Sequence, residues 1–150
     1  MEIRPANIQD LNTLVPLFDG YRQFYKQPTD TQGALHFLLQ RFELGDSVIL
    51  LACNDQGQGL GFTQLYPSFS SVSMQRTYIL NDLFVLESAR GMGVATALMN
   101  KAKEFALQQG AKGLTLETAI DNPAQKLYER LGWKKDVDVF HYTWTAPIGQ

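Results

Sequence analysis

The sequence predicts an α/β (α+β) fold in which one mixed β-sheet carries helices on both of its faces. Two observations lead to this fold class. Strand-like and helix-like hydrophobic patterns alternate along the 150 residues, in the order β, α, α, β, β, β, α, β, α, β. No repeat, linker or low-complexity segment interrupts them. Because this length is typical of one domain, we expect residues 1–150 to form a single domain.

Two amphipathic helices follow a short opening strand. Asn7 is expected to cap the first helix, with Asp10 as its capping-box partner. Apolar residues then recur every three or four positions as far as Tyr25. The second helix is expected to begin at about Asp30 and to end at Gly45, since glycine favours helix C-termini.

The hydrophobic period changes after this helical pair. Residues 48–53 form a continuous apolar run, which is typical of a buried strand. A turn and a second strand at 60–66 complete a hairpin. We expect a polar loop over 67–73 and a longer third strand over 75–85.

The C-terminal half alternates helices and strands. A helix is expected over 94–109, with a short strand at 114–118 after it. A second helix should start near 121–123, where a proline early in the helix costs no hydrogen bond. The alternating pattern of residues 137–144 predicts a final strand.

Composition excludes several classes of function. The 13 basic and 15 acidic residues give a net charge of −2 with no basic stripe, so we expect no nucleic-acid partner. No apolar run is long enough for a membrane span, and we expect no membrane partner. Cys53 is the single cysteine, and no Cys/His cluster has metal-ligand spacing. We therefore expect a cytoplasmic protein without a metal.

A glycine turn between a strand and a helix is the strongest functional signal. Arg90, Gly91 and Gly93 lie between the strand ending at 85 and the helix beginning at 94. The unpaired N–H groups and the dipole of a helix N-terminus attract an anion, and glycines let it approach the backbone closely. The turn lacks the third glycine of a dinucleotide fingerprint and the Lys-Ser/Thr ending of a P-loop. A purely structural glycine turn remains the alternative.

The surrounding residues resemble a known family. Residues 90–95, Arg-Gly-Met-Gly-Val-Ala, resemble the acetyl-CoA pyrophosphate motif of the GNAT superfamily of N-acetyltransferases. Residues 80–85 are similar to the central strand of that family. Its second signature is matched by Asn122, by Tyr128 six residues later, and by Gly132-Trp133. The likeness in element order extends over nearly the whole chain.

This resemblance implies a direct transfer of the acetyl group from acetyl-CoA to a primary amine. The acceptor would be a small amine, a polyamine or a lysine-like side chain. The backbone of Leu83 and Val85 and the side chain of Asn122 would bind the pantetheine arm. The pyrophosphate would be held by Arg90, Gly91, Gly93, Val94, Ala95 and Thr96. A non-catalytic CoA-binding module with the same fold is the alternative function.

The catalytic residues are less well defined than the cofactor motif. By resemblance, Tyr128 would lie near the thioester sulfur, where its O–H can protonate the departing thiolate. The alternative is that Tyr128 is an ordinary residue of the hydrophobic core. Some relatives carry a glutamate base in the central strand, but Asn81 stands there in this chain. Asp82 and Glu117 are the candidate bases, and Asp82 is equally interpreted as structural.

Substrate and assembly are suggested by position alone. Tyr21, Phe24 and Tyr25 fall where the first helices of the family form the acceptor wall, and aromatic rings can hold a cationic amine. Tyr66 and Phe69 fall near a neighbouring strand end. Each of these rings is equally interpreted as ordinary core. The resemblance also implies a homodimer, with an interface around residues 140–142.

Overall fold

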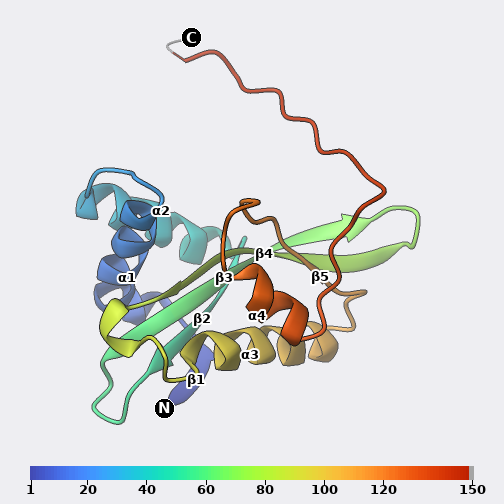
Figure 1. Ribbon diagram of the computed structural model, residues 1–150. Coiled ribbons are helices and arrows are strands. Elements are labelled where there is room, and N and C mark those ends of the chain that lie inside the picture. The colour runs from blue at the N-terminus through green and yellow to red at the C-terminus, as the bar shows by residue number, and fades with distance from the viewer. Residues whose placement is uncertain (149–150) are drawn as a thin grey trace. The chain divides into compact units, whose positions relative to one another are not determined.

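The computed structural model describes residues 1–148, so positions 149–150 of the expected domain lie outside the described residues. The chain forms two compact units, Met1–Glu117 and Thr118–Gln150. The first unit contains the sheet and three α-helices, and the second contains a single short α-helix among its described residues (Figure 1).

The first unit is built on a five-stranded mixed sheet with the order β1-β2-β3-β4-β5. Neighbouring strands from β1 to β4 are antiparallel, and β5 runs parallel to β4. The strands are β1 (Glu2–Pro5), β2 (Val48–Cys53), β3 (Gly59–Ser70), β4 (Gln75–Val85) and β5 (Leu114–Thr115). The predicted mixed sheet is confirmed.

Helices cover both faces of this sheet, also as predicted. Helices α1 (Leu11–Phe24) and α2 (Thr31–Leu44) lie against one face, and α3 (Val94–Gln108) lies against the other (Figure 1). Strand β2 is buried continuously from Ile49 to Cys53, because alternate side chains point to opposite faces and each face carries a helix. This double burial explains the unbroken apolar run in the sequence.

The helix ends follow the predicted capping chemistry. The Asn7 side chain accepts a hydrogen bond from the N–H of Gln9, and Asp10 accepts one from the N–H of Asn7. This capping box begins a short 3-10 turn, Ile8–Asp10, that leads into α1. Helix α2 starts after Asp30 and ends at Gly45, as the sequence predicts.

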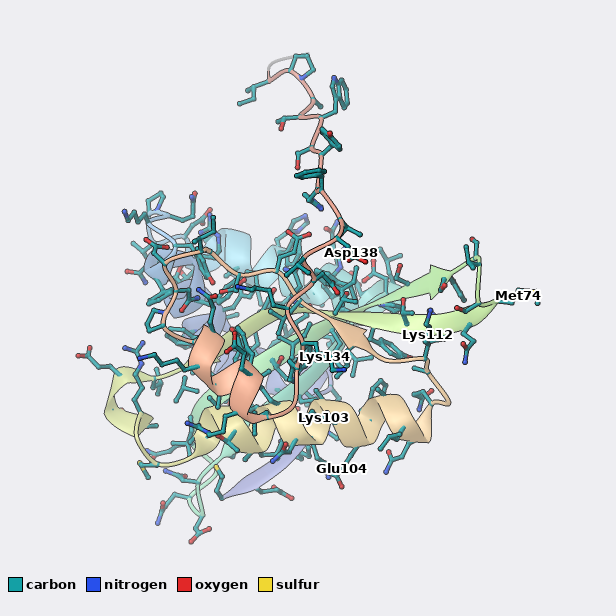
Figure 2. All side chains as sticks on the ribbon, turned by 45° about the vertical axis from the view of Figure 1, so that its right-hand side comes forward. Met74, Lys103, Glu104, Lys112, Lys134 and Asp138 are labelled. Atoms are coloured by element: carbon teal, nitrogen blue, oxygen red, sulfur yellow. The ribbon has the colours of Figure 1, made fainter. Side chains whose placement is uncertain are left out.

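The predicted loop over 67–73 is wrong. Strand β3 continues to Ser70, which pairs with Gln75 of β4, and the two strands form a long hairpin. Figure 2 shows Met74 at the tip of this hairpin and Lys112 beside it. The Lys112 Nζ donates a hydrogen bond to Ser73 Oγ at 2.7 Å. Polar residues here face solvent from a two-stranded ribbon, which local composition does not distinguish from a loop.

Strand β4 contains the irregularity that shapes the site. Gln64 of β3 pairs with Asp82, whereas the next residue, Leu65, pairs with Leu80. Asn81 is therefore an extra residue, and the ladder has a β-bulge at this point. On the opposite edge of β4, β5 pairs only with Tyr78 and Ile79.

The second unit departs from two expectations. Its helix α4 spans only Gln125–Arg130 and begins later than predicted. The predicted strand over 137–144 is wrong, because these residues carry no strand in the structure. An extended segment becomes a strand only when a partner strand supplies its hydrogen bonds, and alternation in the sequence does not identify that partner.

In the first unit, the strand predicted at 114–118 is reduced to Leu114–Thr115.

Candidate functional site

The N-terminus of α3 has the geometry of an anion site. The two glycines before it, Gly91 and Gly93, both have φ near +79°, a left-handed conformation that favours glycine. Apart from the adjoining residues, no described atom lies within 4 Å of the place where a Cβ would stand on either of them. No side chain caps the helix that begins at Val94. The N–H groups of the first turn are therefore not capped by a side chain, an arrangement that suits an anion such as a phosphate.

Arg90 is joined to the end of β4. Its Nε donates a hydrogen bond to the carbonyl oxygen of Val85 at 3.2 Å. This bond uses one of the five N–H donors of the guanidinium group. The side chain thus contributes a positive charge next to the two glycines.

The last residues of β4 have no strand partner on the edge opposite β3 among the described residues. The N–H of Leu86 donates to Leu60 of the β3 side at 2.9 Å. Because backbone groups alternate along a strand, those of Leu83 and Val85 point to the other edge. Within the described residues, β5 pairs with β4 only at Tyr78 and Ile79, so this part of the edge has no strand partner.

A pocket of about 370 Å³ lies in the first unit, between the helical pair and the bulge of β4. Four aromatic rings and three charged side chains contribute to its wall, together with small residues of α2. The lining residues are Phe18, Tyr21, Arg22, Asp30, Gly33, Ala34, Phe37, Tyr66, Asn81 and Asp82. Volumes of this order are typical of sites for small molecules.

Asp82 is the carboxylate at the bulge and is only 1% exposed. Gln64 Nε2 donates to its Oδ2, and Asn81 Nδ2 donates to its Oδ1, both at 2.7 Å. Ser47 Oγ in turn donates to Gln64 Oε1 at 2.9 Å, which fixes the orientation of that amide. Burial raises the pKa of Asp82, and the hydrogen bonds to its carboxylate only partly oppose this rise. The group is therefore a stronger proton acceptor than an exposed aspartate.

Two tyrosines present their hydroxyl groups to the same region. The Tyr21 O–H donates to the carbonyl oxygen of Asn81 at 3.1 Å. Burial, together with the negative charge of Asp82, raises the pKa of Tyr21 and raises that of Tyr66 to about 12. Both phenols consequently keep their protons at neutral pH.

Of the three aromatic residues expected in the acceptor wall, the structure places one at the pocket. Tyr21 lines the pocket, but Phe24 and Tyr25 do not belong to its lining, and they are 59% and 52% exposed. Tyr25 packs edge-on against the Tyr21 ring at 5.1 Å. Phe69 lies on the long hairpin beneath the guanidinium of Arg76, away from the pocket.

Sequence reasoning missed most of the pocket wall. Phe18, Tyr21 and Arg22 have the spacing of neighbours on one helix face, and this signal could have placed them together. No comparable local signal connects them with Phe37 of α2 or with the bulge of β4. These contacts join segments that are far apart in the chain.

The other candidate base has a different environment. Glu117 is exposed at the end of the first unit, beyond β5, and it is not part of the pocket lining. The pocket therefore brings Tyr21 and Asp82 together without Glu117.

Asn122 and Tyr128 belong to the second unit. The Asn122 Oδ1 accepts a hydrogen bond from the N–H of Ala124 at 2.9 Å, which stabilises the turn before α4. Tyr128 lies on α4 and is partly buried, with its ring 6.4 Å from that of Trp133. The N–H of Trp133 donates to the Tyr128 carbonyl oxygen at 3.0 Å, so the Gly132-Trp133 pair closes the helix. The local geometry of the second signature is thus a capped short helix that carries the tyrosine.

Within residues 1–148, no helix combines the length and the apolar character that crossing a membrane requires.

Comparisons with known proteins agree on one family. The model of the acetyltransferase (GNAT) family matches residues 14–133. YhfO of Bacillus subtilis strain 168, an uncharacterized N-acetyltransferase, is 50% identical over 98% of this chain and 99% of its own length. A Haemophilus influenzae protein named "probable acetyltransferase" is 32% identical over 86% of this chain and 97% of its own. A crystal structure of a "probable acetyltransferase" has a TM-score of 0.93 and 41% identity, and it covers 98% of this chain and 99% of that protein.

Proposed function

The chain belongs to the acetyltransferase (GNAT) family and is an N-acetyltransferase with acetyl-CoA as co-substrate. We propose the following roles for its residues in the reaction. We propose that the two units act as one catalytic domain. The family match supports this, because residues 14–133 cross the boundary between Glu117 and Thr118.

The anion site at α3 holds the acetyl donor in this proposal, and its geometry is the observation that carries the proposed function. The groups assigned to the pyrophosphate are Arg90, Gly91, Gly93 and the backbone of Val94, Ala95 and Thr96. The open edge of β4 offers backbone groups of Leu83 and Val85 to the pantetheine arm, and Asn122 is proposed as a further contact. The bound thioester supplies an activated acetyl group.

The acceptor is a primary amine that enters the pocket at Asp82. An alkylammonium group has a pKa of about 10.4, so it must lose a proton before its nitrogen can attack the acetyl carbonyl. Asp82 takes this proton, and its raised pKa makes it an effective base. The C–N bond then forms as the C–S bond breaks. Tyr128 donates its phenolic proton to the departing CoA thiolate. The second proton lost by the amine nitrogen restores the Tyr128 phenol, and the proton taken by Asp82 passes to solvent, so the net reaction releases one proton.

Three acceptor classes agree with this chemistry: small amines, polyamines and lysine-like side chains. All of them carry a primary ammonium group, which a buried carboxylate and aromatic rings can bind. The pocket contains both kinds of group, with Asp82 beside Tyr21 and Tyr66.

Release of free thiol from acetyl-CoA in the presence of primary amines tests this proposal. We expect saturable release with wild-type protein, and a decrease in kcat of about 100-fold for Tyr128→Phe if the phenol is the acid. Tyr25→Phe is the matched control, because Tyr25 is half exposed and does not line the acceptor pocket. An unchanged rate in Tyr128→Phe would remove the acid role. Binding of acetyl-CoA without amine-dependent release would instead favour the non-catalytic module.

We further propose a cytoplasmic homodimer. Residues 137–144 expose a row of large apolar side chains, among them Phe140 (90%), Tyr142 (89%) and Trp144 (82%), which a second copy would cover. The buried free thiol of Cys53 suits a reducing compartment. A monomeric mass by light scattering at working concentration would contradict the dimer.

A further inference from the structure

The side chain opposite Asp82 in the sheet is a buried amide. Gln64 of β3 pairs with Asp82 of β4 and is 0% exposed. A polar group in the protein interior is destabilising unless its hydrogen bonds are satisfied. Gln64 meets this condition at both ends, because its Nε2 donates to Asp82 Oδ2 at 2.7 Å and its Oε1 accepts from Ser47 Oγ at 2.9 Å. One chain of hydrogen bonds thus runs from Ser47 through Gln64 to Asp82.

Ser47 determines which end of the amide faces the carboxylate. A glutamine side chain has an oxygen that only accepts hydrogen bonds and a nitrogen that only donates them. Because the Ser47 hydroxyl donates to the oxygen, the nitrogen is directed to Asp82. A reversed amide would place the oxygen of Gln64 against an oxygen of Asp82. The observed orientation favours the ionised carboxylate, since an N–H donor stabilises a negative charge.

The second amide at Asp82 differs from Gln64 in its exposure. Asn81 Nδ2 donates to Asp82 Oδ1 at 2.7 Å, but Asn81 is an exposed residue of the pocket wall. Water can replace a donor at such a position. Gln64 is fully buried, so loss of its N–H would remove a donor that water cannot replace.

The other ionisable groups around Asp82 come from three elements. Those that line the pocket are Tyr21 and Arg22 of α1, Asp30 at the start of α2, and Tyr66 of β3. Burial raises the pKa of both tyrosines, so they stay protonated at neutral pH. Strand β2 contains no charged residue, and α3, with Lys101, Lys103 and Glu104, covers the opposite face of the sheet (Figure 1). A change at Gln64 or Ser47 leaves all of these groups in place and alters only the amide at Asp82.

We propose that Gln64 and Ser47 are positioning residues, which hold an amide N–H on Asp82 and so keep its carboxylate in the ionised form that the reaction requires. This inference rests on the proposed function, because that function assigns Asp82 as the base. Neither Gln64 nor Ser47 belongs to the pocket lining, so their effect on the acceptor passes through Asp82.

The pH profile of kcat/KM with n-pentylamine as acceptor tests this role. Gln64→Met keeps the length of the side chain and removes the N–H donor. The limb that reports ionisation of Asp82 should move to higher pH by about one unit or more, which below the limb is a decrease in kcat/KM of about 10-fold. Above the limb, kcat/KM should return to within about twofold of the wild-type value, because Asp82 is then ionised in both proteins.

Two variants of Ser47 test the same chain from its other end. Ser47→Ala releases the amide and should move the limb in the same direction by a smaller amount, whereas Ser47→Thr keeps a hydroxyl and should restore the wild-type profile. Because Ser47 is only partly buried, this pair is informative even if Gln64→Met does not fold.

Thr63→Val is the matched control. Thr63 is the neighbour of Gln64 on β3 and is also 0% exposed, but its Oγ1 donates to the backbone carbonyl oxygen of Asp82, at 2.7 Å. The carboxylate keeps both of its amide donors in this variant, so the limb should stay at its wild-type position.

A limb that stays in place in both Gln64→Met and Ser47→Ala would overturn the inference. Two other results would do the same: an equal loss of kcat/KM at every pH, which indicates a merely structural role, and an equal shift of the limb in Thr63→Val. In each of these cases a limb that Asp82→Asn abolishes leaves the proposed base in place. Persistence of the limb in Asp82→Asn would overturn both the inference and the base.

Discussion

Asp82 lies at the β-bulge of β4 and also lines the pocket as a carboxylate. The β-bulge places it next to the extra residue Asn81, and the amides of Asn81 and Gln64 occupy both of its oxygens. The sequence alone left its role open between a base and a structural group. Burial could not be inferred from the strand pattern, because the bulge shifts which side chains face the helical pair.

The pH dependence of kcat/KM distinguishes the two candidate bases. Asp82 must be ionised to accept a proton, so kcat/KM should rise as pH increases through its raised pKa. Asp82→Asn should remove this limb and lower kcat/KM by about 100-fold or more, whereas Glu117→Gln should retain it. A limb that persists in Asp82→Asn, or that disappears in Glu117→Gln, would contradict the assignment.

The same pKa shift has an opposite consequence for stability. A carboxyl group whose pKa is raised in the folded state binds its proton more tightly there than in the unfolded chain. Its contribution to the free energy of unfolding is therefore present at low pH and is lost as pH rises through the raised pKa. An ionised Asp82, which the proposed base requires, therefore costs some stability near neutral pH.

At the scale of elements, the junction between α1 and α2 fixes the pocket wall. Asp19 of α1 accepts hydrogen bonds from Thr29 Oγ1 at 2.6 Å and from the N–H of Asp30 at 2.8 Å. These bonds lower the pKa of Asp19 and hold the start of α2 against α1. Gly33 and Phe37 are positioned as pocket residues by this contact.

Asp19→Asn tests how strongly this junction is held. We expect the free energy of unfolding to decrease by about 1–3 kcal/mol at neutral pH, because buried hydrogen bonds to a charged acceptor are lost. Since the folded pKa is lowered, the contribution is present above the unfolded value of 3.8 and is lost as pH falls through the folded value. Urea unfolding at about pH 7 and about pH 3 should show the difference between the two proteins shrinking in acid.

An exposed pair provides the control for this measurement. Asp46→Asn removes the ion pair with Arg41 at the surface and should cost about 1 kcal/mol or less at either pH. A loss for Asp19→Asn that is equally large in acid would show that packing, and not the carboxylate, holds the junction.

Helices were easier to predict than strands for a physical reason. Helices α1 and α2 have their capping residues and periodic apolar faces in one contiguous segment each, so Asp30 and Gly45 mark α2 correctly. A strand depends on a partner elsewhere in the chain. The extension of β3 to Ser70 and the missing strand over 137–144 were both determined by pairing, which local pattern does not specify.

For the whole molecule, the same difference between local and long-range signals distinguishes the glycine turn from the pocket. The glycine turn is contiguous, and the sequence predicts its geometry and its anion chemistry from Arg90 to Thr96 alone. The pocket is assembled from α1, α2, β3 and β4, so Arg22 and Phe37 could not be related to Asp82 before the fold was known. Family resemblance identified the reaction class, and the pocket is the proposed site of the acceptor.

Acetyl-CoA binding to two glycine variants, measured by isothermal titration calorimetry, tests the central claim most directly. Gly93→Ala and Gly57→Ala are closely matched, because the two glycines have φ of +79° and +77° and both have open space at the Cβ position. Each should cost about 1–2 kcal/mol of backbone strain in the folded state. Only Gly93 lies at the N-terminus of α3, where the added methyl group would meet the pyrophosphate. We predict that Gly93→Ala raises Kd for acetyl-CoA at least about 10-fold and that Gly57→Ala leaves it within about twofold; equal Kd values for the two variants would contradict the assignment of this turn to the acetyl donor.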